Sequence, residues 1–115
     1  MKEEDFKERA KQSTTWMQTS HDPEAVRLRA LLDDRGLRAD EVLLIELFPD
    51  DVQFLFGLLI TPDRRCIQFG MDYLHKPVDQ AVFTEWEDLT GSFSETPYRD
   101  QFVAGLELLW QQLSG

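Results

Sequence analysis

The chain has 115 residues, and its 22 acidic and 12 basic side chains give a formal net charge of −10. Its composition, 42% hydrophobic and 30% charged, is typical of one globular domain, which we assign to residues 1–115. A domain of this size buries roughly two-thirds of its unfolded surface, which is enough for one core. The negative charge argues against binding to nucleic acid or to an anionic membrane, and it favours a basic protein partner.

Several other classes of site are excluded by residue counts. Cys66 is the only cysteine, so the chain can form neither an internal disulfide nor a multi-cysteine zinc site. The six glycines are too dispersed for a phosphate-binding loop, and we expect no cofactor and no metal. The first residues are too charged for a signal peptide, and no apolar run approaches the ~18 residues that span a membrane. We therefore expect a cytoplasmic protein.

Two helices are predicted in the N-terminal third. Residues 2–18 carry a narrow apolar stripe at spacings of four, three and four, which predicts a helix that docks only weakly over residues 1–20. A second helix is predicted from Asp22-Pro23 to about Arg35, because an acidic cap precedes a proline at the first helical position. Gly36 suits a left-handed stop, followed by the apolar Leu37. The first stripe consists of Phe6, Ala10, Ser13 and Met17, with Trp16 beside it, and the second of Ala25, Leu28 and Leu32, with Leu31 beside it.

The pattern then changes to that of strands. The apolar run 42–48, the turn residues Pro49-Asp50-Asp51 and a second apolar run, 52–60, predict an antiparallel pair. Proline at the second position of Thr61-Pro62-Asp63-Arg64 predicts a type I turn. Residues 65–73 then alternate between an apolar and a largely polar face, which is typical of a strand. Both faces of the strand in 52–60 are apolar, so we expect it to be central, with helices or a second chain covering its second face.

The stretch 78–89 fits two structures. Val78, Val82, Trp86 and Leu89 have helical spacing, whereas the composition from about Ala81 to Asp88 favours a strand, which we prefer. The final helix is capped by Thr96-Pro97 and continues to the end of the chain. Its stripe consists of Tyr98, Phe102, Leu106, Leu109, Trp110 and Leu113.

This order of elements predicts an α+β domain. It comprises two N-terminal helices, a three- or four-stranded antiparallel β meander, and a C-terminal amphipathic helix packed on the sheet. Because the central strand has two apolar faces, a homodimer is expected if the first helix leaves one of them open.

Candidate catalytic groups are few. His75 follows the third strand, and with Asp72 and Asp79 it could form an imidazole and carboxylate metal site, although Pro77 keeps the three from sharing one helix. Cys66 lies near Arg64 and Arg65, which would favour a thiolate, but a small buried side chain is the better interpretation. Glu85 and Glu87 share one face of the fourth strand and could act as paired acids, or they could simply protect an exposed sheet edge.

The strongest functional pattern is an acidic stretch with aromatic residues. Residues 78–100 carry six carboxylates and one arginine, and therefore half of the net charge. Aromatic side chains supply desolvated contact area and carboxylates steer a basic partner, so we predict a partner-binding surface here. The alternative is an aromatic core with a solvated acidic rim. The predicted partner-binding residues are Glu85, Trp86, Glu87, Asp88 and Glu95.

The leading hypothesis is therefore a small acidic, non-enzymatic interaction protein. It would be an inhibitor, immunity-type protein or adaptor, as several small bacterial nuclease inhibitors are, which present acids where the enzyme expects phosphate. One alternative is a dimeric α+β domain that binds a small apolar ligand. Another is a small enzyme that uses carboxylates and His75. The apolar site of the first alternative would be lined by Phe54, Phe56, Phe69, Met71 and Trp110.

Overall fold

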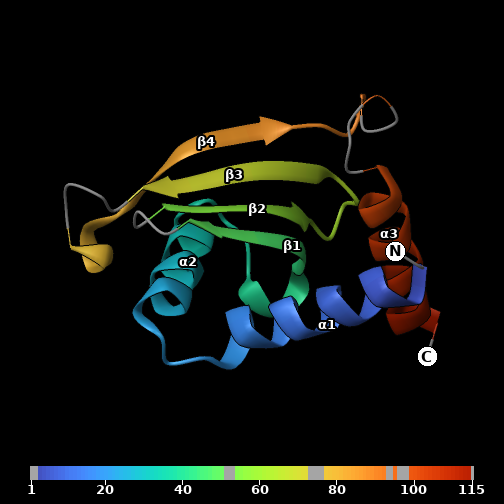
Figure 1. The fold of residues 1–115 in the computed structure, drawn as a ribbon, viewed down its shortest axis with the longest axis horizontal. Coiled ribbons are helices and arrows are strands. Elements are labelled where there is room, and N and C mark those ends of the chain that lie inside the picture. The colour runs from blue at the N-terminus through green and yellow to red at the C-terminus, as the bar shows by residue number, and fades with distance from the viewer. Residues whose placement is uncertain (1–2, 51–53, 73–76, 93–94, 96–98, 115) are drawn as a thin grey trace.

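The predicted α+β fold is confirmed by the computed structural model, which describes residues 3–50, 54–72, 77–92, 95 and 99–114. Helices α1 (Glu3–Thr19) and α2 (Pro23–Asp34) precede the sheet, and α3 (Arg99–Ser114) follows it. The strands are β1 (Leu43–Asp50), β2 (Phe54–Ile60), β3 (Cys66–Asp72) and β4 (Val82–Asp88). They form one antiparallel meander in the order β1-β2-β3-β4 (Figure 1). Short 3₁₀ turns at Ala39–Glu41 and Val78–Gln80 lead into β1 and β4.

Helices cover both faces of the central strand β2, as its two apolar faces predict. On one face, Leu59 forms a core cluster with Leu28 and Leu32 of α2, and we call this the α2 face. On the other, Leu58 and Ile60 form a cluster with α3, and we call this the α3 face. The cover on the α3 face reaches Leu58 and Ile60, whereas Phe56 is half-buried and the side chain of Phe54 lies outside the described residues, so the expected homodimer stays a prediction.

Helix α1 lies along the outer edge of β1 and contacts β1, α2, α3 and the 3₁₀ turn at Ala39–Glu41 (Figure 1). Ala10 and Met17 of the predicted stripe are fully buried. The Thr14 hydroxyl accepts a hydrogen bond from Leu44 N–H at 2.9 Å and donates to Leu44 C=O at 3.4 Å. Polar contacts thus anchor α1 more firmly than its narrow apolar stripe indicates.

A β-bulge in β1 adds a second polar anchor for α1. The register with β2 shifts between Leu44 and Glu46, so that Ile45 is the extra residue. Such a shift re-aims the side chains beside it. Glu46 is buried, and both of its carboxylate oxygens accept hydrogen bonds from Arg9 of α1 at 3.2 Å.

Helix α2 begins and ends where it was predicted, but its N-terminal cap differs. Gly36 has a φ of 75°, and its N–H and that of Leu37 donate to Asp33 C=O and Leu32 C=O, both at 2.9 Å, which is the Schellman arrangement. At the start, Asp22 makes no side-chain cap. Its carboxylate instead accepts a hydrogen bond from Trp16 Nε1 at 3.1 Å and so ties the end of α1 to the start of α2.

The predicted turns flanking β2 have different outcomes. Pro49 and Asp50, assigned above to a turn, belong to β1 and pair with Leu55 and Phe54. Proline is tolerated there because β1 is an edge strand, where not every N–H is needed for pairing. The turn at 61–64 is confirmed, since Arg64 N–H donates to Thr61 C=O at 2.9 Å. Arg64 has a φ of 66°, in the left-handed region that the sequence did not predict for it.

The C-terminal part confirms the strand that we preferred for 78–89 and corrects the stripe of the last helix. β4 spans Val82–Asp88, and the helical alternative is wrong. In α3, Gly105 and Leu108 are buried while Leu106 is only half-buried. The close approach at Gly105 rotates the helix, because a Cβ there would lie 2.5 Å from Ile45 Cγ2. Thr96, Pro97 and Tyr98, and the side chains of Trp110 and Leu113, lie outside the described residues.

Candidate functional site

The predicted partner-binding residues lie on or just after β4, at the edge of the sheet opposite α1 (Figure 1). The structure divides them between two faces. Glu85 and Glu87 pair with Gly70 and Gln68 on the α3 face, whereas Trp86 pairs with Phe69 on the α2 face. Asp88 shares the face of Trp86, and Glu95 is exposed beyond the turn that follows β4. The set therefore flanks an edge strand on both sides and does not form one flat patch.

On the α3 face, the acidic residues are exposed. A second bulge, between Gly70 and Met71 of β3, leaves Thr84 as an extra residue beside Glu85. The Thr84 hydroxyl donates to Gly70 C=O at 3.4 Å. Among the described residues, neither Glu85 nor Glu87 has an ion-pair partner, in contrast to Glu46 and Asp88. These two carboxylates are thus available to a positively charged group.

On the α2 face, Trp86 is half-buried in a small aromatic cluster. Its ring centroid lies 4.9 Å from that of Phe83, which in turn contacts Phe69 edge-on at 5.7 Å. The Arg35 guanidinium, just after α2, lies 4.4 Å from the Trp86 centroid and 5.4 Å from that of Phe83. This is cation–π geometry, and it places a cation of the protein itself on the indole.

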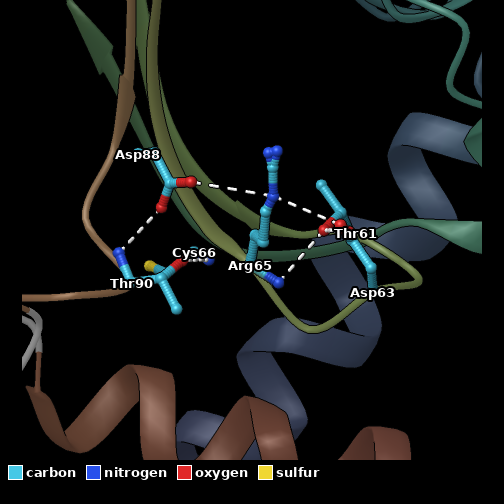
Figure 2. A network of polar contacts seen from close by, with 6 residues as sticks. All are labelled: Thr61, Asp63, Arg65, Cys66, Asp88 and Thr90. Carbon is cyan, nitrogen blue, oxygen red and sulfur yellow. Dashed lines mark hydrogen bonds and ion pairs between the residues drawn. The ribbon is translucent and has the colours of Figure 1, made fainter.

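A polar network fixes Asp88 at the end of β4. Figure 2 shows Arg65 between the carboxylates of Asp88 and Asp63, with Nε at 3.7 Å and 3.2 Å from their nearest oxygens. Asp88 Oδ1 also accepts a hydrogen bond from Thr90 N–H at 2.9 Å, and hydrogen bonds from Thr90 are the main reason that the pKa of Asp88 is lowered. The pKa of Asp63 is lowered as well, first by its hydrogen bond from the Thr61 hydroxyl and then by that from Arg65. Both carboxylates are therefore held in their charged form.

Trp86, Arg35 and Arg65 border a shallow groove of about 470 Å³ between the end of α2 and the turn that joins β2 to β3. The sequence did not identify this groove, because Arg35 and Trp86 lie far apart along the chain and only the fold brings them together. The only part of its lining that the sequence indicated was the turn predicted at 61–64, which contributes Thr61 and Asp63. Its lining consists of Asp34, Arg35, Leu37, Thr61, Asp63, Arg65, Ile67 and Trp86.

Cys66 is a structural residue. It is buried, and burial followed by repulsion from Asp88 raises the pKa of its thiol to about 11. Its N–H donates to Thr90 Oγ1 at 2.9 Å, which ties the start of β3 to the end of β4 (Figure 2). The thiolate interpretation is therefore wrong at neutral pH, because the thiol stays protonated.

The other proposed sites find no assembled geometry in the part of the chain that the structure describes. His75 lies outside that part, and the described residues contain no group of three or more metal-ligating side chains. The apolar set divides between faces, since Phe56 pairs with Gly70 on the α3 face whereas Phe69 and Met71 lie buried on the α2 face. The side chains of Phe54 and Trp110 lie outside the described residues.

Comparison with protein-family models, with curated proteins and with solved structures finds no match for this chain. Within the described residues, none of the helices has the length and apolar character needed to cross a membrane.

Proposed function

We propose that this chain is a small acidic, non-enzymatic interaction protein of the inhibitor, immunity or adaptor type, which binds a basic protein partner in the cytoplasm. The observation that carries the proposal is the pair of exposed carboxylates, Glu85 and Glu87, on the edge strand β4, whose outer side no described residue covers. Other carboxylates of the sheet and its approaches are matched by an arginine, as Glu46 is by Arg9 and Asp40 by Arg38. A carboxylate that has no ion pair within the protein can form one with a lysine or arginine of a partner.

The surroundings of the pair also support charge-driven recognition. Half of the net charge of −10 lies on residues 78–100, so the field on this side attracts basic proteins and repels polyanions. Trp86 and Phe83 flank the acids on the other face with half-buried aromatic area. Aromatic anchors beside a polar rim are typical of protein interfaces.

The test is capture of partners from the native lysate by the immobilised protein, at about 0.05 M and at about 0.5 M salt, where screening differs strongly. The variant Glu85→Lys/Glu87→Lys reverses the two carboxylates. Its matched control, Glu8→Lys/Glu41→Lys, makes the same change in charge at two exposed positions near the opposite edge.

We expect a basic protein that is retained at low salt by the wild type and by the control, and lost at high salt and with the β4 variant. A captured protein that is acidic or neutral, or whose binding is insensitive to salt and to the Glu85 and Glu87 reversal, would contradict the proposal.

A further inference from the structure

The two edges of the sheet differ in whether other parts of the chain form hydrogen bonds with the outward-facing backbone groups of the edge strand. At the β1 edge, α1 lies alongside the strand, and the Thr14 side chain takes both the N–H and the C=O of Leu44. At the β4 edge, the described residues provide no such cover, and β4 pairs only with β3 (Figure 1). An uncovered edge is a template on which an extended chain can add as a further strand.

We propose that the β4 edge binds an extended segment of the basic partner as a fifth strand, and that this segment carries lysine or arginine at every second position. The inference rests on the proposed function and adds the mode of binding and the pattern of the bound segment. Two features of β4 carry it, the direction of its free backbone groups and the spacing of its carboxylates.

The free backbone groups follow from the register. Leu89 N–H donates to Cys66 C=O at 2.8 Å, so the backbone of Leu89 faces β3. Along an antiparallel ladder, residues alternate between facing the neighbouring strand and facing away from it. The N–H and C=O groups of Asp88 and Trp86 therefore face outward, where an added strand would receive them.

The side chains set the pattern of the added strand. Glu85 and Glu87 project from the α3 face two residues apart, which is the repeat of side chains on one face of a strand. Side chains directly opposite each other on paired strands have Cβ atoms about 5 Å apart, within reach of an ion pair between glutamate and lysine or arginine. Alternate basic residues would meet both glutamates, and the residue between them would lie beside Trp86.

A second copy of this chain is a poor occupant of the same edge. Antiparallel pairing of two β4 strands would bring Glu85, Glu87 and Asp88 of one chain close to those of the other, and like charges on facing strands are destabilising. The charge that repels a copy is the charge that attracts a basic segment. The bulge at Thr84 limits regular pairing to Glu85–Asp88, so the bound segment is short.

The probes for this proposal are two synthetic peptides of the sequence Lys-Thr-Lys-Val-Lys-Thr-Lys. One has an unmodified backbone, and in the other the Thr and Val amides are N-methylated, which removes pairing groups and keeps the charge. Affinity is measured by titration at low salt, and hydrogen exchange of the protein amides shows where the peptide binds.

We expect the unmodified peptide to bind and to slow exchange at Trp86 and Asp88, and N-methylation to weaken binding about tenfold or more, the equivalent of one or two lost hydrogen bonds. The variant Glu85→Gln/Glu87→Gln should weaken it about tenfold as well, whereas the matched Glu8→Gln/Glu41→Gln should not. Light scattering should show a monomer, or a dimer whose formation leaves hydrogen exchange at Trp86 unchanged.

Each contrary result overturns strand addition without deciding the proposed function. Equal binding of the two peptides would mean recognition by charge alone. Failure of the unmodified peptide to bind, protection confined to residues outside β4, or a dimer that slows exchange at Trp86 would each show that β4 does not receive a basic strand. The proposed function would fail separately, in the capture experiment, if the partner were not basic or ignored the reversal of Glu85 and Glu87.

Discussion

Gly105 in α3 offers a sharp test of how the last helix packs, because two effects of replacing it by alanine have opposite signs. At an exposed helix position, glycine to alanine stabilises by about 1 kcal/mol, since alanine loses less backbone entropy on folding. Gly105 is buried against the α3 face of the sheet, so the second effect is steric. An added Cβ would lie 2.5 Å from Ile45 Cγ2 and 2.7 Å from Ile60 Cδ1.

The steric effect is the larger one. Carbon atoms reach their best contact at about 3.5–4.0 Å, so both contacts are about 1 Å too short. Ile60 Cδ1 can rotate away, but Ile45 Cγ2 is attached directly to Cβ and moves only with χ1 or with the backbone of β1. Overpacking of this kind costs about 1–3 kcal/mol. After the gain of about 1 kcal/mol in helix propensity is subtracted, we expect Gly105→Ala to lower the free energy of unfolding by up to about 2 kcal/mol.

Urea unfolding followed by far-ultraviolet circular dichroism measures this difference, and the melting temperature should fall by roughly 4 °C for each kcal/mol. Gly91→Ala is the control, because a Cβ at that position meets nothing within 4 Å. The Gly91→Ala protein should be as stable as the wild type or slightly more stable. Ile60→Val removes the Cδ1 methyl, so it should cost less in the Gly105→Ala background than alone. A Gly105→Ala protein that is about 1 kcal/mol more stable than the wild type, the full gain in helix propensity, would refute the close approach of α3.

Three further predictions concern the β2–β3 turn and its network. Arg64→Gly should stabilise the fold by about 0.5 kcal/mol, because a left-handed φ of 66° costs an ordinary residue more free energy than it costs glycine. The urea midpoint of the variant should therefore be higher than that of the wild type, and a lower midpoint would contradict this. The folded-state pKa of Asp88 is lowered from its ordinary value of 3.8, so its contribution to stability is present above that value and is lost as the pH falls through the folded-state pKa. The stability difference between wild type and Asp88→Asn should therefore shrink between about pH 5 and about pH 2, and a difference independent of pH would refute the assignment. Cys66, buried and with its pKa raised to about 11, should react with iodoacetamide only as fast as the protein unfolds, so rapid labelling without denaturant would be inconsistent with the structure.

Local signals in the sequence were enough for the order of elements and for most of their boundaries. The Asp22-Pro23 start and the Gly36 stop of α2 depend on neighbouring residues, and both lie where they were predicted. The two-faced pattern of 52–60 predicted a central strand, since only a strand with neighbours on both faces can bury so many apolar side chains. The error at Pro49 arose because turn residues are also tolerated at a sheet edge, and the sequence does not say which strand is the edge.

The arrangement around the candidate site was less predictable, because it depends on contacts between distant segments. The acidic and aromatic residues of β4 were found from composition, and strand alternation separates the two glutamates from Trp86. The bulge opposite Gly70, which has no sequence signature, places Phe83 on the same face as Trp86. The contact between Arg35 and Trp86 joins the end of α2 to β4. The hydrogen bond between Thr14 and Leu44 likewise could not be predicted from neighbouring residues, since a threonine within a helix indicates only a lowered helix propensity.

The cover on β1 also has a consequence for synthesis on the ribosome. Helix α1 precedes β1 in the chain, so the residues that cover β1 are synthesised before the strand itself. Once α1 has docked on β1, a further strand can join the nascent sheet only on the side towards β4. A chain that lost α1 would expose two edges while still attached to the ribosome, and neighbouring chains on one messenger could pair through them.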